Sequence, residues 1–168
     1  VEPEIHYPAS ESEAVDILQD ADGVLCNLYP LTAGLIGKMK KCKIISRYGV
    51  GYDNVDVEAA SAAGIRVCNV PDYAMEDASD HALALLLACV RKLSYKDRMI
   101  RQGRWNLHNE QRCYRMAGKV MGIIGFGHTG RALTRKISGF GFSRIMVYAP
   151  RTDKDTIRAA GADKADFD

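Results

Sequence analysis

The chain has 168 residues, of which 47% are hydrophobic and 26% are charged, and its formal net charge is +2. This composition is typical of a globular protein with one or two domains, and it excludes a disordered chain of low hydrophobicity and high net charge. Charges of both signs are interspersed, and no apolar run approaches the ~20 residues of a membrane-spanning helix, so we expect neither nucleic acid nor a membrane among the partners.

The five cysteines are scattered along the chain, and none of them has C-x-x-C spacing. An odd number of isolated cysteines, set mostly among apolar residues, indicates reduced and buried thiols and not a disulfide framework or a metal site. No signal peptide opens the sequence. We therefore predict a cytoplasmic protein without a bound metal.

Strands and helices alternate through the first part of the chain. Ser10 and Glu13 form a capping box that predicts a helix start, and Gly23 ends this helix before a short buried strand over 24–28. The elements expected next are a helix capped by Thr32, a strand over 43–46, a helix over 55–63 and a strand over 65–70. Alternation at this spacing predicts a parallel sheet with right-handed crossovers.

A glycine-rich turn, RYGVGYDN at residues 47–54, follows the predicted strand over 43–46. Ligands of open α/β sheets bind beyond the carboxyl ends of the strands, which is where this turn falls. The amide N–H groups of Val50 and Gly51 could face a small anion such as a carboxylate. The same pattern fits a tight turn that needs glycine for its dihedral angles, so the spacing leaves both interpretations open.

Two helices are predicted next. The first, over 76–91, is so apolar that it should be buried between layers or at an interface. The second, over 92–102, is amphipathic and ends at Gly103, and residues 105–117 lack periodicity and are predicted to form a connecting loop.

An apolar run over 120–124 leads into the sequence Gly125-Phe126-Gly127-His128-Thr129-Gly130, and a helical pattern follows. A strand that turns through G-x-G-x-x-G into a helix is typical of dinucleotide-binding folds. Gly125 would permit the sharp turn, Gly127 would leave room for a pyrophosphate, and Gly130 would let the helix pack closely on the strand. An ordinary glycine turn is the alternative, and the flanking strand and helix favour dinucleotide binding. A second strand over 144–148 and a helix over 152–160 complete the pattern.

Four stretches in matching order resemble the D-2-hydroxyacid dehydrogenase family; they are RYGVGYDNVD at 47–56, CNVPDYAMEDASDHALALLLA at 68–88, residues 103–105, and GKVMGIIGFGHTGR at 118–131. The most similar branch includes phosphoglycerate-dehydrogenase-like enzymes and the C-terminal-binding-protein corepressors. The resemblance implies an α/β fold with parallel sheets, in which a flavodoxin-like substrate domain, partial at its N-terminus, over 1–92 precedes the first part of a Rossmann domain over 93–168. It further implies a homodimeric NAD(P)-dependent oxidoreductase that interconverts a small D-2-hydroxy acid and a 2-keto acid.

The resemblance also assigns roles to individual residues. The amides of Val50 and Gly51 would hold the substrate carboxylate, and Ala78 would lie near the nicotinamide end of the cofactor. The residues that would line the cofactor pyrophosphate are Gly125, Gly127, His128, Thr129 and Gly130.

One departure from the family pattern concerns the cofactor. The family's usual acidic residue at the end of the second Rossmann strand is replaced by Ala149. An acid there accepts hydrogen bonds from the ribose 2′-hydroxyl and repels a 2′-phosphate. Without that repulsion, Arg151 and Thr152 could bind a phosphate through charge and hydroxyl, so we predict a leaning toward NADP(H). A solvent-facing arginine beside a relaxed NAD site is the alternative.

A second departure concerns catalysis. The family's catalytic arginine, glutamate and histidine would follow the second Rossmann strand, beyond Asp168, so no catalytic residue is expected in this chain. We therefore expect an interior piece of a longer enzyme, one that would fold poorly alone. A dinucleotide-sensing interaction protein of the corepressor kind, or an inactive truncated product, are the alternative functions.

Overall fold

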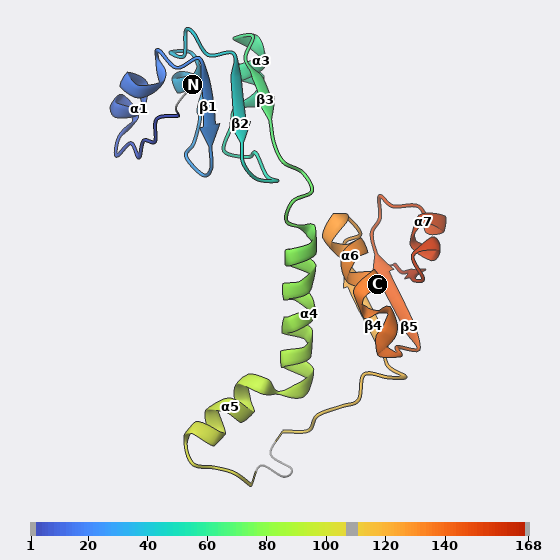
Figure 1. Cartoon of the computed structure of the whole chain (residues 1–168). Coiled ribbons are helices and arrows are strands. Elements are labelled where there is room, and N and C mark those ends of the chain that lie inside the picture. Colours follow the sequence, from blue (N-terminus) through green and yellow to red (C-terminus); the bar gives the residue numbers. More distant parts are fainter. Residues whose placement is uncertain (1–2, 107–110, 167–168) are drawn as a thin grey trace. The chain divides into compact units, whose positions relative to one another are not determined.

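A computed structural model describes residues 3–106 and 111–166 (Figure 1). The chain divides into two compact units, Val1–Tyr73 and Ala74–Asp168, and each is described by itself. The expected functional boundary between residues 92 and 93 stays a prediction. Part of the loop expected over 105–117, residues 107–110, lies outside the described residues.

The first unit is a three-stranded parallel sheet of order β1-β2-β3 with short helices between the strands. Its elements are α1 (Glu11–Leu18), β1 (Gly23–Cys26), α2 (Ala33–Ile36), β2 (Ile44–Arg47), α3 (Val57–Ala62) and β3 (Arg66–Cys68). The Ser10 hydroxyl caps α1 by accepting from the Glu13 amide at 3.2 Å, while the Glu13 carboxylate accepts from Ala9 at 2.8 Å. Thr32 caps α2, and Gly64 ends α3 with φ +73°. These local signals therefore act as the sequence predicts.

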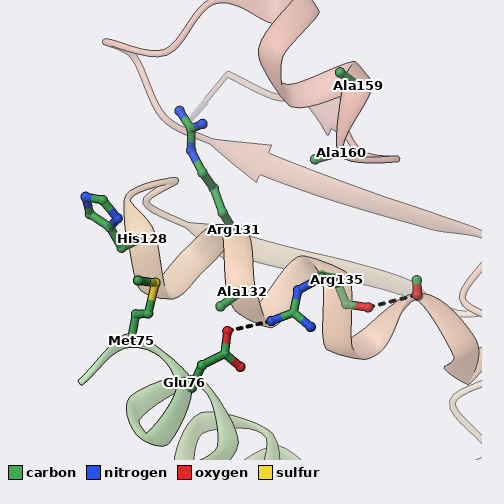
Figure 2. A pocket seen from close by; sticks show the side chains of 9 residues that line it. Met75, Glu76, His128, Arg131, Ala132, Arg135, Ala159 and Ala160 are labelled. Carbon is green, nitrogen blue, oxygen red and sulfur yellow. Dashed lines mark hydrogen bonds and ion pairs between the residues drawn. The ribbon is translucent and has the colours of Figure 1, made fainter. Parts of the chain in front are cut away.

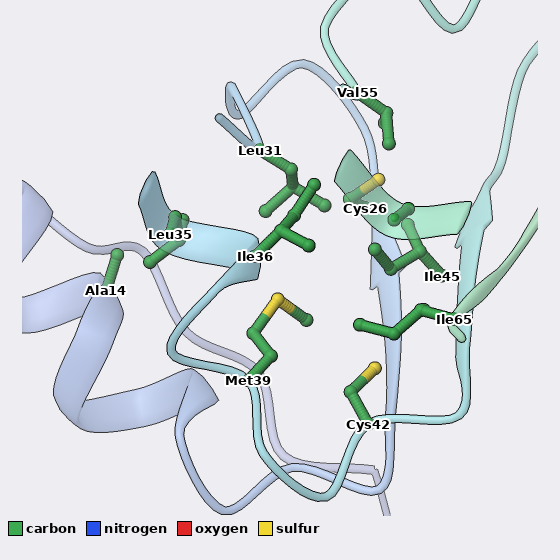
Figure 3. Packing of buried hydrophobic residues seen from close by; sticks show 11 residues of the cluster. Ala14, Cys26, Leu31, Leu35, Ile36, Met39, Cys42, Ile45, Val55 and Ile65 are labelled. Atoms are coloured by element: carbon green, nitrogen blue, oxygen red, sulfur yellow. The ribbon is translucent and has the colours of Figure 1, made fainter. Parts of the chain in front are cut away.

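The core of the first unit lies between the helices and one face of the sheet, as Figure 3 shows. Ile45 of β2 is fully buried, and Leu35 and Ile36 of α2 pack into the same cluster. The strand over 24–28 was expected to be buried, and this prediction is wrong for its outer side chains: Leu25 is 71% and Leu28 74% exposed. A parallel sheet buries both faces only when helices cover both, and the described chain covers one face of β1.

The second unit begins with two consecutive helices, α4 (Met75–Arg91) and α5 (Leu93–Arg101). Lys92 separates them because it adopts a left-handed conformation with φ +57°, from which its amide caps the end of α4. The helix over 76–91 is predicted to be buried between layers or at an interface, and within the described residues it is not buried between layers. The interface alternative stays a prediction. Leu83 and Leu86 contact the core of the second unit, but Leu85 is 54% exposed.

The second sheet is also parallel, in the order β4-β5-β6. Its elements are β4 (Val120–Ile124), α6 (His128–Ile137), the short 3-10 helix η1 (Ser138–Phe140), β5 (Arg144–Tyr148), α7 (Lys154–Ala159) and β6 (Asp163–Lys164). The strand β6 is not among the elements predicted from the sequence, because a two-residue strand has no periodicity to detect. The core of this unit contains Ile137, Val147 and Ile157, all fully buried. Both units thus have the α/β architecture with parallel sheets that the sequence predicts.

The five cysteines are free, but they are not uniformly buried as predicted. Cys26 and Cys42 are buried, whereas Cys68 and Cys89 are exposed. Burial raises the pKa of the Cys26 and Cys42 thiols, which keeps both protonated at neutral pH. Within the described residues, no helix is long and apolar enough to cross a membrane.

Candidate functional site

The loop 47–54 follows β2 at the carboxyl end of the first sheet. The Asn69 side-chain amide donates to the Val50 carbonyl oxygen at 2.8 Å, and the Asn54 side-chain amide donates to two carbonyl groups of the segment after β1 at 2.9 and 3.0 Å. The amide N–H groups of Val50 and Gly51 form no hydrogen bond with another residue that the structure describes, and both residues are exposed. The hydrogen bonds that hold the loop therefore leave two adjacent donors, the Val50 and Gly51 amides, available for an anion.

Arg47, the last residue of β2, adds a cation to this loop. Its guanidinium group lies so close over Gly49 that a Cβ atom on Gly49 would coincide with it. The Arg47 Nε atom is buried and has no hydrogen-bond partner among the described residues. A buried donor without a partner is costly, and an anion is the ligand that satisfies a guanidinium best. Arg47 is not among the site residues predicted from the sequence, although its place at a strand end beside a glycine loop was a signal.

The second candidate region is the turn at residues 125–130, which we call the phosphate turn. Gly125 has φ +93°, a left-handed conformation that favours glycine. A Cβ atom on Gly130 would lie 2.5 Å from the Gly125 carbonyl oxygen, so α6 approaches β4 as closely as the sequence predicts. A Cβ atom on Gly127 would meet nothing within 4 Å, which leaves open space at the start of α6.

Helix α6 presents its N-terminus at this open space. Gly127 is its N-cap and supplies no side-chain cap, and its first turn contains no acidic residue. His128 and Thr129 are exposed there. The first N–H groups of a helix have no partner within the helix and carry a partial positive charge, so this end of α6 is suited to an anion.

Arg131 braces the phosphate turn from the first turn of α6. Its Nε donates to the Phe126 carbonyl oxygen at 3.1 Å, and its guanidinium lies 5.3 Å from the centre of the Phe126 ring. Phe126 is buried, so the contact fixes an exposed cation beside the turn. Arg131 is not among the site residues predicted from the sequence.

A hollow of about 550 Å³ is lined by α6, the start of α4 and the end of α7 (Figure 2). Arg131 and Arg135 project from α6 at its rim, and Met75 and Glu76 line it from the start of α4. His128 also lines it, so the hollow adjoins the phosphate turn.

Helix α4 is joined to α6 through Lys136, which is largely buried. Its ammonium group donates to the Ser79 hydroxyl at 2.8 Å and the Asp80 carboxylate at 2.5 Å, and lies 2.9 Å from the Glu76 carboxylate. Hydrogen bonds from Lys136 and Arg135 lower the pKa of the Glu76 carboxyl. Desolvation opposes the charge on Lys136 but is outweighed by its hydrogen bonds to Asp80 and Glu76, so the pKa of Lys136 is raised. This network fixes the start of α4, which carries Ala78 on an exposed position, against α6.

The third candidate region is the turn at residues 149–152, which follows β5 and which we call the 2′ turn. Ala149 is buried, Arg151 is exposed, and the Thr152 amide closes the turn by donating to the Ala149 carbonyl oxygen at 3.1 Å. Asp153 then caps α7, and hydrogen bonds from the Thr156 hydroxyl and amide lower the pKa of its carboxyl.

The predicted site residues thus fall in two places. Val50 and Gly51 lie in the first unit. The second unit contains the phosphate turn, the 2′ turn at the carboxyl end of the neighbouring strand, and Ala78. The phosphate turn and the 2′ turn are adjacent because β4 and β5 pair along their length and the Gly125 amide donates to the Tyr148 carbonyl oxygen at 2.9 Å.

The chain is an α/β protein with parallel sheets, and it has a glycine turn between a strand and the open end of a helix and a second loop after the next strand. These features are typical of the folds that bind dinucleotides. A comparison with protein families gives a more specific assignment. Residues 1–164 match the family model for the catalytic domain of D-isomer specific 2-hydroxyacid dehydrogenases. The chain belongs to this family, as the resemblance in its sequence predicts.

Individual relatives agree with this assignment. The chain is 36% identical over 145 residues to a glyoxylate reductase of Korarchaeum cryptofilum, an alignment that covers 84% of the chain and 43% of the relative. It is 30% identical over 166 residues to a D-3-phosphoglycerate dehydrogenase of Methanocaldococcus jannaschii, and this alignment covers 98% of the chain and 31% of the relative. A solved acyclic imino acid reductase in complex with NADPH and D-Arg matches the structure with a TM-score of 0.78 at 25% identity, covering 94% of the chain and 50% of that structure. The chain therefore spans less than half the length of these curated relatives.

Proposed function

We propose that the full-length protein is an NAD(P)-dependent D-2-hydroxyacid dehydrogenase that interconverts a small D-2-hydroxy acid and the corresponding 2-keto acid by hydride transfer. The observation that carries this proposal is the open space at Gly127, directly before the uncapped N-terminus of α6, in a chain of this family. That arrangement fits a pyrophosphate, whose oxygens need bare amide donors at close range.

In this proposal the chain's own residues bind and orient the cofactor. The main-chain groups of Gly125, Gly127, His128, Thr129 and Gly130 line the pyrophosphate, and Ala78 lies toward the nicotinamide end. The nicotinamide group supplies the hydride chemistry when it is bound. Arg131 keeps the turn in place through its contacts with Phe126.

The substrate carboxylate is held by the loop 47–54. The amides of Val50 and Gly51 donate to the carboxylate, and Arg47, whose Nε is buried without a partner among the described residues, adds charge. The relatives named glyoxylate reductase favour a small 2-keto acid of that kind. We propose that the catalytic arginine, glutamate and histidine of the family belong to the remainder of the full-length protein.

The cofactor is proposed to be NADP(H) in preference to NAD(H). Ala149 offers no carboxylate to repel a 2′-phosphate, and Arg151 and Thr152 are placed in the same turn to bind it. We also propose a homodimer, because α4 and α5 leave apolar side chains such as Leu85 and Leu93 half exposed.

The test is reduction of glyoxylate and hydroxypyruvate by the purified full-length protein with NADPH and with NADH. We expect turnover of at least one keto acid and a higher kcat/KM with NADPH. Turnover that strongly prefers NADH would refute the NADP assignment alone. Binding of dinucleotide without turnover of any 2-keto acid would refute the enzyme assignment and favour a dinucleotide-sensing interaction protein.

A paired variant tests the phosphate turn itself. Gly127→Val fills the open space at a position whose φ is −75°, so the backbone tolerates the change while the pyrophosphate is displaced. We expect loss of dinucleotide affinity with little change in thermal stability. Unchanged affinity would exclude this turn as the cofactor site.

A further inference from the structure

Lys164 is a residue that no motif singles out, yet it lies under the 2′ turn. It belongs to β6, which pairs with β5 so that Lys164 is opposite Val147. From there its ammonium group donates to the Thr152 carbonyl oxygen at 2.7 Å and to the Pro150 carbonyl oxygen at 3.5 Å. Two of the four carbonyl groups of the turn are therefore engaged by one cation.

This contact bears on anion binding at the turn. Carbonyl oxygens carry partial negative charge, and free ones beside Arg151 would repel a phosphate and compete for the guanidinium. Lys164 engages the carbonyl groups of Pro150 and Thr152, and it adds a positive charge to a turn whose residues already include an arginine and a hydroxyl.

The turn is also restrained on its other sides. The Thr152 amide donates across it to Ala149 at 3.1 Å, and Asp153 caps α7 directly after it. Pro150 limits its first central position to one φ value. Lys164 adds a further restraint from the neighbouring strand β6. Arg151 therefore projects from a backbone that is already ordered before a ligand binds.

We infer that Lys164 is a positioning residue for cofactor choice, which holds the 2′ turn in the form that accepts a 2′-phosphate. This inference rests on the proposed assignment of the 2′ turn to the adenosine ribose. Lys164 acts through the turn and its charge and does not touch the reacting atoms.

The experiment measures binding of two probes that differ only in the 2′-phosphate, adenosine 2′,5′-bisphosphate and 5′-AMP, to the full-length protein by calorimetry. Wild type should prefer the bisphosphate. Lys164→Met should lower this preference about three- to tenfold while 5′-AMP affinity stays unchanged, as expected for a lost preorganising contact. Lys164→Arg, which keeps charge and donors, should restore most of the preference. Lys154→Met is the matched control. It removes the same positive charge from the neighbouring helix α7, but Lys154 forms no hydrogen bond with the 2′ turn among the described residues.

Each outcome has a distinct meaning. A wild-type protein without preference for the bisphosphate overturns the NADP assignment and the role of Lys164 together. A wild-type preference with equal losses for both probes in Lys164→Met shows a general structural brace and overturns the role of Lys164 alone, as does an equal effect of Lys154→Met. If Lys164→Met does not fold, Lys164→Gln, which keeps one donor without the charge, is measured with the same two probes and judged by the same ratio.

Discussion

The ammonium group of Lys136 in α6 lies 2.8 Å from the hydroxyl oxygen of Ser79 in α4. Ser79 is fully buried, and its hydroxyl donates in turn to the Glu76 carbonyl oxygen at 2.9 Å. One lysine therefore satisfies a buried hydroxyl and also engages the carboxylates of Glu76 and Asp80. The contact joins α6, the helix of the phosphate turn, to α4 across 57 positions of sequence.

The first prediction follows from this contact. Lys136→Met should lower the thermal unfolding midpoint of the full-length protein by several degrees, because Ser79 and two carboxylates lose their shared donor. Arg135→Met is the control, since Arg135 is adjacent in α6 and bonds to the same Glu76 but is 65% exposed. Its effect should be much smaller, because exposed ion pairs contribute little. If the unfolding midpoint falls equally in the two variants, the burial of Lys136 does not strengthen its contacts.

The second prediction concerns pH. Hydrogen bonds from Lys136 and Arg135 hold the pKa of the Glu76 carboxyl below its ordinary value of 4.5. A carboxyl with a lowered pKa in the folded state contributes stability above the unfolded-state value, and this stability is lost as pH falls through the folded-state pKa. The stability difference between wild type and Glu76→Gln should therefore be constant near neutral pH and shrink below about pH 4.5. Thermal melts across this range measure it, and a difference that does not change with pH would show that Glu76 is not in the predicted contact.

The third prediction separates two glycines of the second unit. Gly130→Ala should destabilise the protein by about 1–3 kcal/mol, because its Cβ would lie 2.5 Å from the backbone oxygen of Gly125, which cannot move without displacing the turn. Gly139→Ala places its Cβ in open space and should change stability by about 0.5 kcal/mol or less. Denaturant unfolding of both variants provides the comparison. A neutral Gly130→Ala would mean that α6 and β4 are not so closely packed.

The fourth prediction tests Arg47 without replacing it. A Cβ at Gly49 would occupy the position of the Arg47 guanidinium, so Gly49→Ala should push this flexible side chain away. If Arg47 contacts the substrate carboxylate, affinity for oxalate, an unreactive analogue of glyoxylate, should fall about tenfold in the full-length protein. Gly34→Ala is the control, because its Cβ would make only ordinary contacts at 3.8 Å. Oxalate affinity that is the same in both variants would remove Arg47 from the site.

Much of the fold could be predicted from short stretches of sequence. Ser10, Thr32 and Gly64 mark helix ends because capping and left-handed stops involve residues within about four positions of each other. The phosphate turn had an equally local signal, since Gly125 adopts a left-handed conformation and Gly130 lies directly against the Gly125 carbonyl oxygen. The family was predictable for the same reason, because its motifs are runs of consecutive residues.

Other features of the site had no local signal. The strand β6 is too short for periodicity, and yet it brings Lys164 to the 2′ turn. The exposure of Leu25 depends on which face of the sheet helices cover, and strand periodicity does not report it.

The amino-acid order of this chain is sufficient to specify alternating strands and helices, the glycine turn that can admit a pyrophosphate, and membership of the dehydrogenase family, because each depends on neighbours along the backbone. Folding in three dimensions adds the hydrogen-bond partners of Lys136 and Lys164 and the burial of the Arg47 Nε atom. A side chain's hydrogen bonds and burial depend on which distant segments pack around it, and that is a property of the assembled sheet and helices.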